Sequence, residues 1–409
     1  MTMNNTLTRR TLMGAAVTAS IFAAGAVSAQ ETFKVGAINP YSGPLALYGN
    51  EVTRGYELAA DAINENGGVL GKTVEIVKGN ATNPQEGISA VEQLATRDNV
   101  DVLIGTYLSS VAGAASETAL NYNKLYWDTN ALASVLTERG LPNFVRSGPY
   151  SVSFAQVSVD LILDSLAGKL GKAPSDLKVW IEHEESVYGS SIAEYQKEQL
   201  EEAGVQVLGV GAHSYKSIDL TDSVLRAKDA EPDIWLQTGY VPDSNLLLRT
   251  AENQRFDPPV KVFVGTGDTN ETLEALGEEG VEGLLVVSYP RPDVSEEFGP
   301  GSDAYLEAYR AKFDQDPVAP QSMAAFVGMK IMAETVNEAG NADPAAVAEA
   351  LPKMEKPEGT YETGFGVDFN DNKQNVRAHP TVIQWQGGNQ VTVFPEVAAQ
   401  GSQMLGIGN

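Results

Sequence analysis

The sequence has no cysteine among its 409 residues and only three histidines. The missing cysteines exclude disulfide scaffolds, thiolate catalysis, zinc–thiolate sites and iron–sulfur clusters. Basic residues are also scarce, with 28 Lys and Arg against 54 Asp and Glu, for a formal net charge of −26. This balance argues against nucleic acid and anionic membranes as partners, because both attract clustered Lys and Arg.

The motifs of common enzymes and cofactor sites are missing as well. No GxSxG, HExxH or GxxxxGK[ST] pattern occurs, and no GxGxxG follows a strand-like run. These patterns carry hydrolase nucleophiles, zinc ligands and phosphate-binding loops. We therefore expect neither an enzyme nor a bound cofactor. A run of Glu182, His183, Glu184 and Glu185 is interpreted as a solvated loop cluster, and His213 and His379 as isolated polar residues.

Apolar runs are short everywhere except near the N-terminus. Arg9 and Arg10 precede an uncharged stretch that ends in Val27, Ser28 and Ala29. A charged start, an apolar centre and a small-x-small end predict a cleaved signal peptide over 1–29, with a twin-arginine-like start. Cleavage leaves 380 residues with a net charge of −28. Because no cysteine is present to carry a lipid, we expect a free monomer in the periplasm.

Short β-branched runs alternate with helical patterns along the rest of the chain. This alternation predicts parallel sheets flanked by helices, and nine strands favour two α/β lobes. The predicted strands are 33–39, 73–78, 101–105, 125–129, 177–182, 205–210, 234–238, 261–265 and 283–288. Helices are expected at 48–66, 305–313, 322–338 and 344–351, and two further strands at 366–370 and 381–384 around a polar turn at 370–373.

Polar residues follow two of the predicted strands, at the end where open α/β sheets bind ligands. Ser109 and Ser110 begin a helix of small residues after the strand at 101–105. A helix start offers free N–H groups to a carboxylate, although simple N-capping explains serine there equally well. Asn130 follows the next strand and serves either a ligand or a turn. Trp127 lies inside that strand, so we expect it in the core.

Several motifs follow one another along the chain: VGAINPYSGP at 35–44, LYG at 47–49, GYELA at 55–59, INENGGVLGK at 63–72, and the runs 105–116, 187–189, 239–240 and 283–286. In this order and spacing they resemble the Leu/Ile/Val-binding proteins of branched-chain amino acid ABC transporters. The resemblance implies a type I periplasmic binding fold, in which two lobes joined by three crossovers close on a small ligand. It places lobe 1 at 30–148 plus 291–363 and lobe 2 at 149–290 plus 364–409, with a membrane permease and an ATPase as partners.

The resemblance also implies roles for individual residues. Ser109 matches the serine that binds the ligand carboxylate, Tyr48 matches a cleft residue of lobe 1, and Tyr188 and Tyr240 match tyrosines of lobe 2 that close over the ligand. Asp268 is the candidate for holding an ammonium group, one position displaced from the family's acidic residue. The remaining positions depart from leucine binders. Asn130 and Leu132 stand where those proteins usually have Ala and Thr, and Tyr107 and Gln321 stand where they often have hydrophobic residues.

These departures leave the ligand class open. The predicted function is the capture of a small carboxylate-bearing ligand, an amino acid or a derivative, for an ABC importer. The polar and aromatic lining also suits an aromatic carboxylate or, through cation–π contacts, a quaternary amine. A ligand-sensing module on the same fold is a further alternative.

Overall fold

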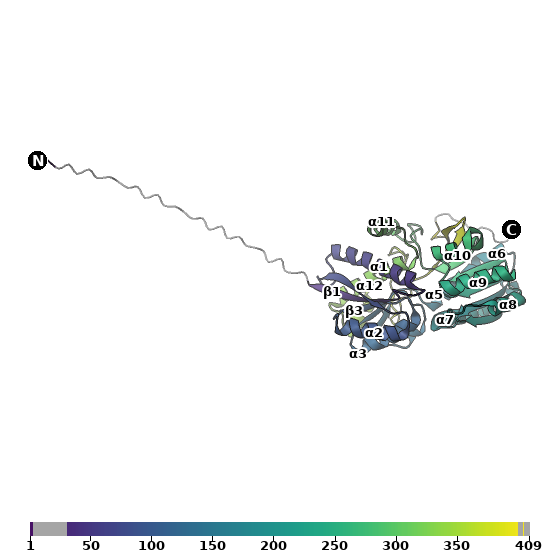
Figure 1. The fold of residues 1–409 in the computed structure, drawn as a ribbon, viewed down its shortest axis with the longest axis horizontal. Coiled ribbons are helices and arrows are strands. Elements are labelled where there is room, and N and C mark those ends of the chain that lie inside the picture. The colour runs from purple at the N-terminus through teal and green to yellow at the C-terminus, as the bar shows by residue number, and fades with distance from the viewer. Residues whose placement is uncertain (3–30, 400–403, 405–409) are drawn as a thin grey trace. The chain divides into compact units, whose positions relative to one another are not determined.

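Strands and helices alternate in the computed structural model, which describes residues 1–2, 31–399 and 404 (Figure 1). The predicted signal peptide lies almost wholly outside the described residues. The strands are β1 (Thr32–Asn39), β2 (Thr73–Asn80), β3 (Val102–Gly105), β4 (Tyr126–Asp128), β5 (Phe144–Arg146), β6 (Lys178–Glu184), β7 (Gln206–His213), β8 (Ile234–Thr238), β9 (Val260–Val264), β10 (Leu285–Ser288), β11 (Thr381–Gln386) and β12 (Asn389–Phe394).

The helices between the strands are mostly long and amphipathic. They are α1 (Ala46–Glu65), α2 (Pro84–Thr96), α3 (Ser109–Asn121), α4 (Val135–Glu138), α5 (Ser151–Asp160), α6 (Ala167–Lys169), α7 (Val187–Glu202), α8 (Thr221–Ala230), α9 (Val241–Gln254), α10 (Asn270–Val281), α11 (Ser302–Phe313), α12 (Gln321–Ala339) and α13 (Pro344–Ala350). Local sequence sets their ends. The Asn83 side chain accepts the N–H of Glu86 and Pro84 starts α2, while Gly340 ends α12 in the left-handed conformation.

The strands form two separate sheets. The first has the order β2-β1-β3-β4-β5, and each of its neighbouring pairs is parallel. The second has the order β12-β11-β10-β9-β8-β6-β7. Its strands β6 to β10 are parallel, and β11 and β12 add an antiparallel hairpin at the edge. Parallel neighbours need crossover helices, which explains the long helices between strands.

We call the part built on β1–β5 the first lobe and the part built on β6–β12 the second lobe. The helices α11, α12 and α13 follow β10 in the chain, yet α12 packs along α1 in the first lobe (Figure 1). The chain then returns to the second sheet at β11. It therefore passes between the sheets after β5, after β10 and before β11, which confirms the predicted type I architecture with three crossovers.

The strand predicted at 366–370 is wrong. This segment forms only isolated bridges, and the nearby backbone pairs instead with the first lobe: Gln374 bridges Arg146 in parallel, and the N–H of Asn375 donates to the Arg146 carbonyl at 2.9 Å. The antiparallel hairpin consists of β11 and β12, which Gly387 and Gly388 connect. The sequence analysis missed β5 and β12, since three residues are too few for a periodic pattern and β12 is half polar.

Buried apolar side chains fill both lobes. Trp127 is fully buried in β4 and its Nε1 donates to Ser147 Oγ at 2.9 Å, which confirms it as a core residue. Among the described residues, no helix combines the length and the apolar character needed to cross a bilayer.

Candidate functional site

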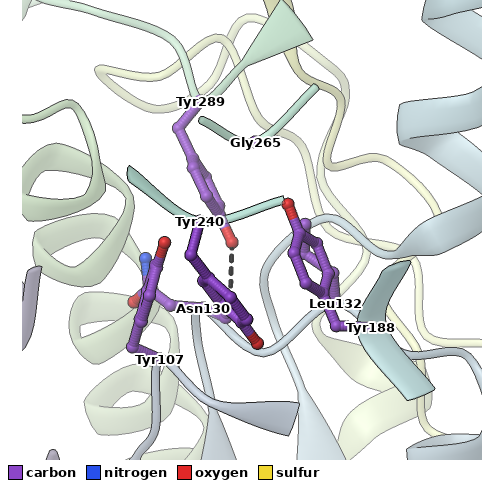
Figure 2. Close-up of a pocket in the computed structure, with 7 residues that line it drawn as sticks. All are labelled: Tyr107, Asn130, Leu132, Tyr188, Tyr240, Gly265 and Tyr289. Carbon is purple, nitrogen blue, oxygen red and sulfur yellow. Dashed lines mark hydrogen bonds between the residues drawn. The ribbon is translucent and has the colours of Figure 1, made fainter. Parts of the chain in front are cut away.

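A narrow pocket lies where the two lobes meet, with a cavity volume of about 10 Å³ (Figure 2). Its lining residues all follow the carboxyl ends of strands, as expected of parallel sheets. They are Tyr107, Asn130 and Leu132 from the first lobe, Tyr188, Tyr240 and Gly265 from the second, and Tyr289 from the crossover after β10. The fold thus brings together five of the ten predicted site residues as direct lining.

Tyrosine rings dominate this pocket. Tyr48 stacks on Tyr107 with ring centroids 4.5 Å apart, and Tyr107 lies 5.9 Å from Tyr240. Tyr188 and Tyr215 contact the Tyr240 ring at 5.2 and 5.1 Å. Figure 2 shows the rings of Tyr107, Tyr240 and Tyr188 next to one another. Burial raises the pKa of the Tyr107, Tyr188 and Tyr240 phenols well above the usual value, so the pocket wall carries neutral hydroxyls.

The start of α3 presents the hydrogen-bond donors. Ser109 is the first helical residue, the N-cap is Leu108, and neither serine caps the helix. Ser109 Oγ accepts the N–H groups of Leu132 and Ala133, each at 3.2 Å, so its own proton remains to be donated. The N–H groups of Ser109 and Ser110 have no acceptor among the described residues, as the geometry of a helix start requires. The Ser110 side chain is exposed and lies outside the pocket lining.

A buried ion pair fixes the loop that carries Asn130 and Leu132. Arg146 Nε lies 3.1 Å from Asp128 Oδ2, and both side chains are fully buried. Asp128 Oδ1 accepts the N–H groups of Asn130 and Ala131, while Arg146 donates to the Ala133 carbonyl at 2.8 Å. Burial raises the pKa of Asp128 to about 6, against the opposing effect of Arg146. The sequence analysis predicted no role in the site for Arg146; the polar residues that end β4 and β5 were the available signal.

The Asn130 side chain makes its hydrogen bonds within the protein. Thr129 Oγ1 donates to Asn130 Oδ1 at 2.6 Å, and Asn130 Nδ2 donates to the Gln321 carbonyl at 3.3 Å. The Asn130 carbonyl accepts the Tyr289 hydroxyl at 2.7 Å, the bond dashed in Figure 2. Asn130 therefore shapes the pocket wall, and each of its two amide atoms already makes one hydrogen bond within the protein.

Asp268 lies in the loop after β9 and is fully buried. Its Oδ1 accepts the Tyr48 hydroxyl at 2.8 Å, and its Oδ2 accepts Ser288 Oγ at 2.5 Å and Gln321 Nε2 at 3.2 Å. We call these four residues the Asp268 cluster. None of the ion pairs found between residues 31 and 399 includes Asp268, and none of the four residues lines the pocket. The structure thus places Tyr48, Asp268 and Gln321 together, behind the Tyr107 ring.

The second lobe holds its tyrosines through backbone contacts. The Tyr188 hydroxyl donates to the Val264 carbonyl at 3.1 Å and to the Gly239 carbonyl at 3.3 Å. Gly265 has a φ of +67°, and a Cβ there would lie 2.2 Å from the Tyr188 hydroxyl. Glycine at 265 is thus required both by the backbone conformation and by the Tyr188 ring that packs on it.

A charged triad lies beneath Tyr240, and here two sequence interpretations are wrong. Glu182 is buried in β6, so its run is no solvated loop, and His213 is not isolated. His213 Nδ1 lies 3.0 Å from Glu182 Oε1, and its Nε2 lies 2.9 Å from Asp243 Oδ2. Asp243 Oδ1 in turn accepts the Tyr240 N–H at 3.0 Å. Glu182 lies inside β6, His213 ends β7 and Asp243 follows β8; these strands are neighbours in the sheet, which only the strand order reveals.

The flanking carboxylates, Glu182 and Asp243, raise the pKa of His213 to about 9, although burial alone would lower it. His213 is therefore an imidazolium at neutral pH and satisfies both buried carboxylates. Among the described residues, no group of three or more His, Asp and Glu side chains is arranged to hold a metal ion.

Comparison with known proteins adds the family. The family model described as "Periplasmic binding protein" matches residues 32–389. The Leu/Ile/Val-binding protein homolog 7 of Brucella suis is 36% identical over 385 residues, which cover 94% of this chain and 96% of the relative.

Solved structures share the fold at low identity. The LivJ branched-chain amino acid binding protein of Streptococcus pneumoniae, in complex with isoleucine, has a TM-score of 0.74 at 20% identity and covers 88% of this chain and 98% of its own. An R. palustris solute binding protein of an ABC transporter, in complex with 4-hydroxybenzoate, has a TM-score of 0.73 at 20% identity, covering 88% and 95%. The resemblance found in the motifs is thereby confirmed: the chain belongs to the periplasmic binding protein family, the substrate-binding proteins of ABC transporters.

Proposed function

We propose that this protein captures a small carboxylate-bearing ligand in the pocket between its lobes and delivers it to an ABC importer. One observation carries the proposal: the start of α3, with its free N–H groups, is joined to the tyrosine-walled pocket through Ser109, whose hydroxyl accepts the N–H of the lining residue Leu132 although Ser109 itself does not line the pocket. The positive end of the α3 dipole favours an anion at this point. None of the seven lining residues in the described part of the chain is positively charged, and the donors at the start of α3 would therefore bind the carboxylate.

The tyrosine walls favour a planar aromatic carboxylate over an aliphatic one. Tyr107, Tyr188 and Tyr240 offer ring faces and edges, and the R. palustris protein of the same fold is in complex with 4-hydroxybenzoate. An aromatic ring inserted between such rings gains about 0.5–1.5 kcal/mol per contact beyond its buried area. The same rings would accept a quaternary amine, but the donors at α3 would then lack an acceptor.

An amino acid is the second candidate. Asp268 is a buried carboxylate without a cation in the described part of the chain, and Gln321 Oε1 beside it is buried with no hydrogen-bond partner there. Both atoms would accept an ammonium group, and the LivJ relative is in complex with isoleucine. This candidate requires the ligand to reach past the Tyr107 ring.

The arrangement of the chain supports hinge closure. We propose lobes close to the predicted ones, 30–148 plus 291–363 and 149–290 plus 364–409, but with the third crossover moved from 363/364 to 378–380, so that 364–377 belong to the first lobe. The contacts of Asn375 with Ser147 and Gly366 support that change, since they tie the preceding segment to the first lobe. We further propose that the mature protein carries no lipid anchor and acts as a monomer. It works with a permease and an ATPase and catalyses no reaction of its own.

Thermal-shift screening of the mature protein tests this function. The panel contains benzoate, 4-hydroxybenzoate, leucine, isoleucine and choline as probes. A carboxylate that raises the melting temperature should do so by RT ln(1 + [L]/Kd), and titration calorimetry then gives its Kd. If choline alone stabilises, the site is an amine site; if no carboxylate binds, the proposal is overturned.

The Ser109→Ala variant tests the anchor. Losing a charge-assisted hydrogen bond should weaken carboxylate binding by about 1–2 kcal/mol. Ser110→Ala is the matched control, because the Ser110 side chain is exposed and outside the pocket lining, and the substitution keeps the backbone N–H. Equal affinities for wild type and Ser109→Ala would remove Ser109 from the site.

A further inference from the structure

We propose that Asp268 joins the two lobes directly and closes the protein without a ligand, rather than serving as an ammonium subsite. This inference rests on the proposed function and deepens it, because it decides between the two ligand classes. Asp268 belongs to the second lobe, where it follows β9, whereas Tyr48 and Gln321 belong to α1 and α12 of the first lobe. Two of its three hydrogen bonds therefore cross between the lobes.

The hydrogen bonds already satisfy most of the carboxylate. Oδ2 accepts two donors and Oδ1 accepts one, which leaves one of about four acceptor positions open. Burial and the neighbouring Asp268 raise the pKa of Tyr48 well above its usual value, so Tyr48 remains a donor at every physiological pH. A ligand ammonium would have to displace these donors, and each displaced group is fully buried.

The ring stack separates the Asp268 cluster from the pocket. Tyr107 lines the pocket, and its ring stacks on Tyr48, which does not line it, with 9° between the ring planes. Tyr48 and Asp268 are therefore behind the wall, not in it. A ligand that fits the space in front of Tyr107 meets hydroxyls and the α3 start, and needs no amine.

The consequence is a specificity for carboxylates without an ammonium group. In matched pairs such as 3-phenylpropanoate with phenylalanine, or 4-methylpentanoate with leucine, the two ligands differ by the α-ammonium alone. We expect the acid without the ammonium to bind at least tenfold more tightly in each pair that binds.

Closure itself is measured without any ligand. Because the chain has no natural cysteine, S89C in α2 and E198C in α7, both exposed, provide two labelling sites for fluorescence energy transfer between the lobes. In this background Y48F removes one hydroxyl and keeps the ring on Tyr107. We expect Y48F to raise the ratio of open to closed molecules by about tenfold, the effect of one hydrogen bond to a carboxylate.

The matched control is Y41F. The Tyr41 hydroxyl bonds to Thr53 and to the Ala37 carbonyl, both in the first lobe, so its removal should leave the energy-transfer distribution unchanged. Equal energy-transfer distributions for Y48F and wild type would overturn the inference. A D268N variant that loses affinity for leucine but not for 4-methylpentanoate would overturn it as well. Failure of every carboxylate to bind would contradict the proposed function instead, and the ligand-free measurement would still decide the role of Asp268.

Discussion

Raising the pH through 9 should destabilise this protein because of one buried residue, His213. Its imidazolium lies between Glu182 and Asp243, and these carboxylates raise its pKa from 6.5 to about 9. At about 1.36 kcal/mol per pKa unit, the folded state gains about 3 kcal/mol from this proton. Since the folded pKa is the higher one, the full gain is present below pH 6.5 and is lost as pH rises through about 9.

Urea unfolding at fixed ionic strength between pH 6 and 10 measures this gain. We expect the wild type to lose about 3 kcal/mol more than His213→Gln over this range, because the variant has no proton to lose there. His379→Gln is the control, since His379 pairs with Glu358 at the surface and is 43% exposed. With three histidines in the chain, NMR of the imidazole signals gives the His213 pKa directly.

Two outcomes would refute this reasoning. One is a His213 signal that titrates near 6.5. The other is a stability difference between wild type and His213→Gln that stays constant across the range. Because Asp243 also accepts the Tyr240 N–H, ligand affinity should fall over the same pH range as stability.

Two further substitutions test the packing around the pocket. Arg146→Met should cost about 3–5 kcal/mol in urea unfolding at pH 7.5, because it leaves the buried Asp128 carboxylate without its cation. The deficit should shrink at pH 5, where Asp128 is protonated, and an equal deficit at both values would contradict the assigned pair. Gly265→Ala and Gly267→Ala both force a side chain into the left-handed region, at about 1–2 kcal/mol each. Only Gly265→Ala also displaces the Tyr188 hydroxyl, so only this variant should bind the ligand more weakly in titration calorimetry. Equal ligand affinities for the two variants would count against Tyr188 as part of the pocket wall.

Local sequence predicts the elements well where a pattern is long. The helix at 48–66 repeats apolar residues at the helical period, and the strand at 234–238 begins with a continuous apolar run typical of a buried strand; both lie within two residues of the expected ends. The three-residue strand β5 offers no period to detect. The segment 366–370 has strand composition, but it forms only single bridges, Val367 with Lys356 and Phe369 with Asn375, which no local pattern encodes.

The order of motifs along the chain also determined the family, the two-lobed fold and the position of Ser109 at a helix start. Only the tertiary structure decided which polar groups meet. Asp268 and Tyr48 are 220 residues apart in the chain, and His213 is 31 residues from Glu182 and 30 from Asp243. Hydrogen bonds and ion pairs depend on a few tenths of an ångström between side chains, whereas periodicity reports only which face of an element is apolar. The order of the strands in each sheet and the closure of one lobe on the other set those distances, and with them the roles of the charged residues.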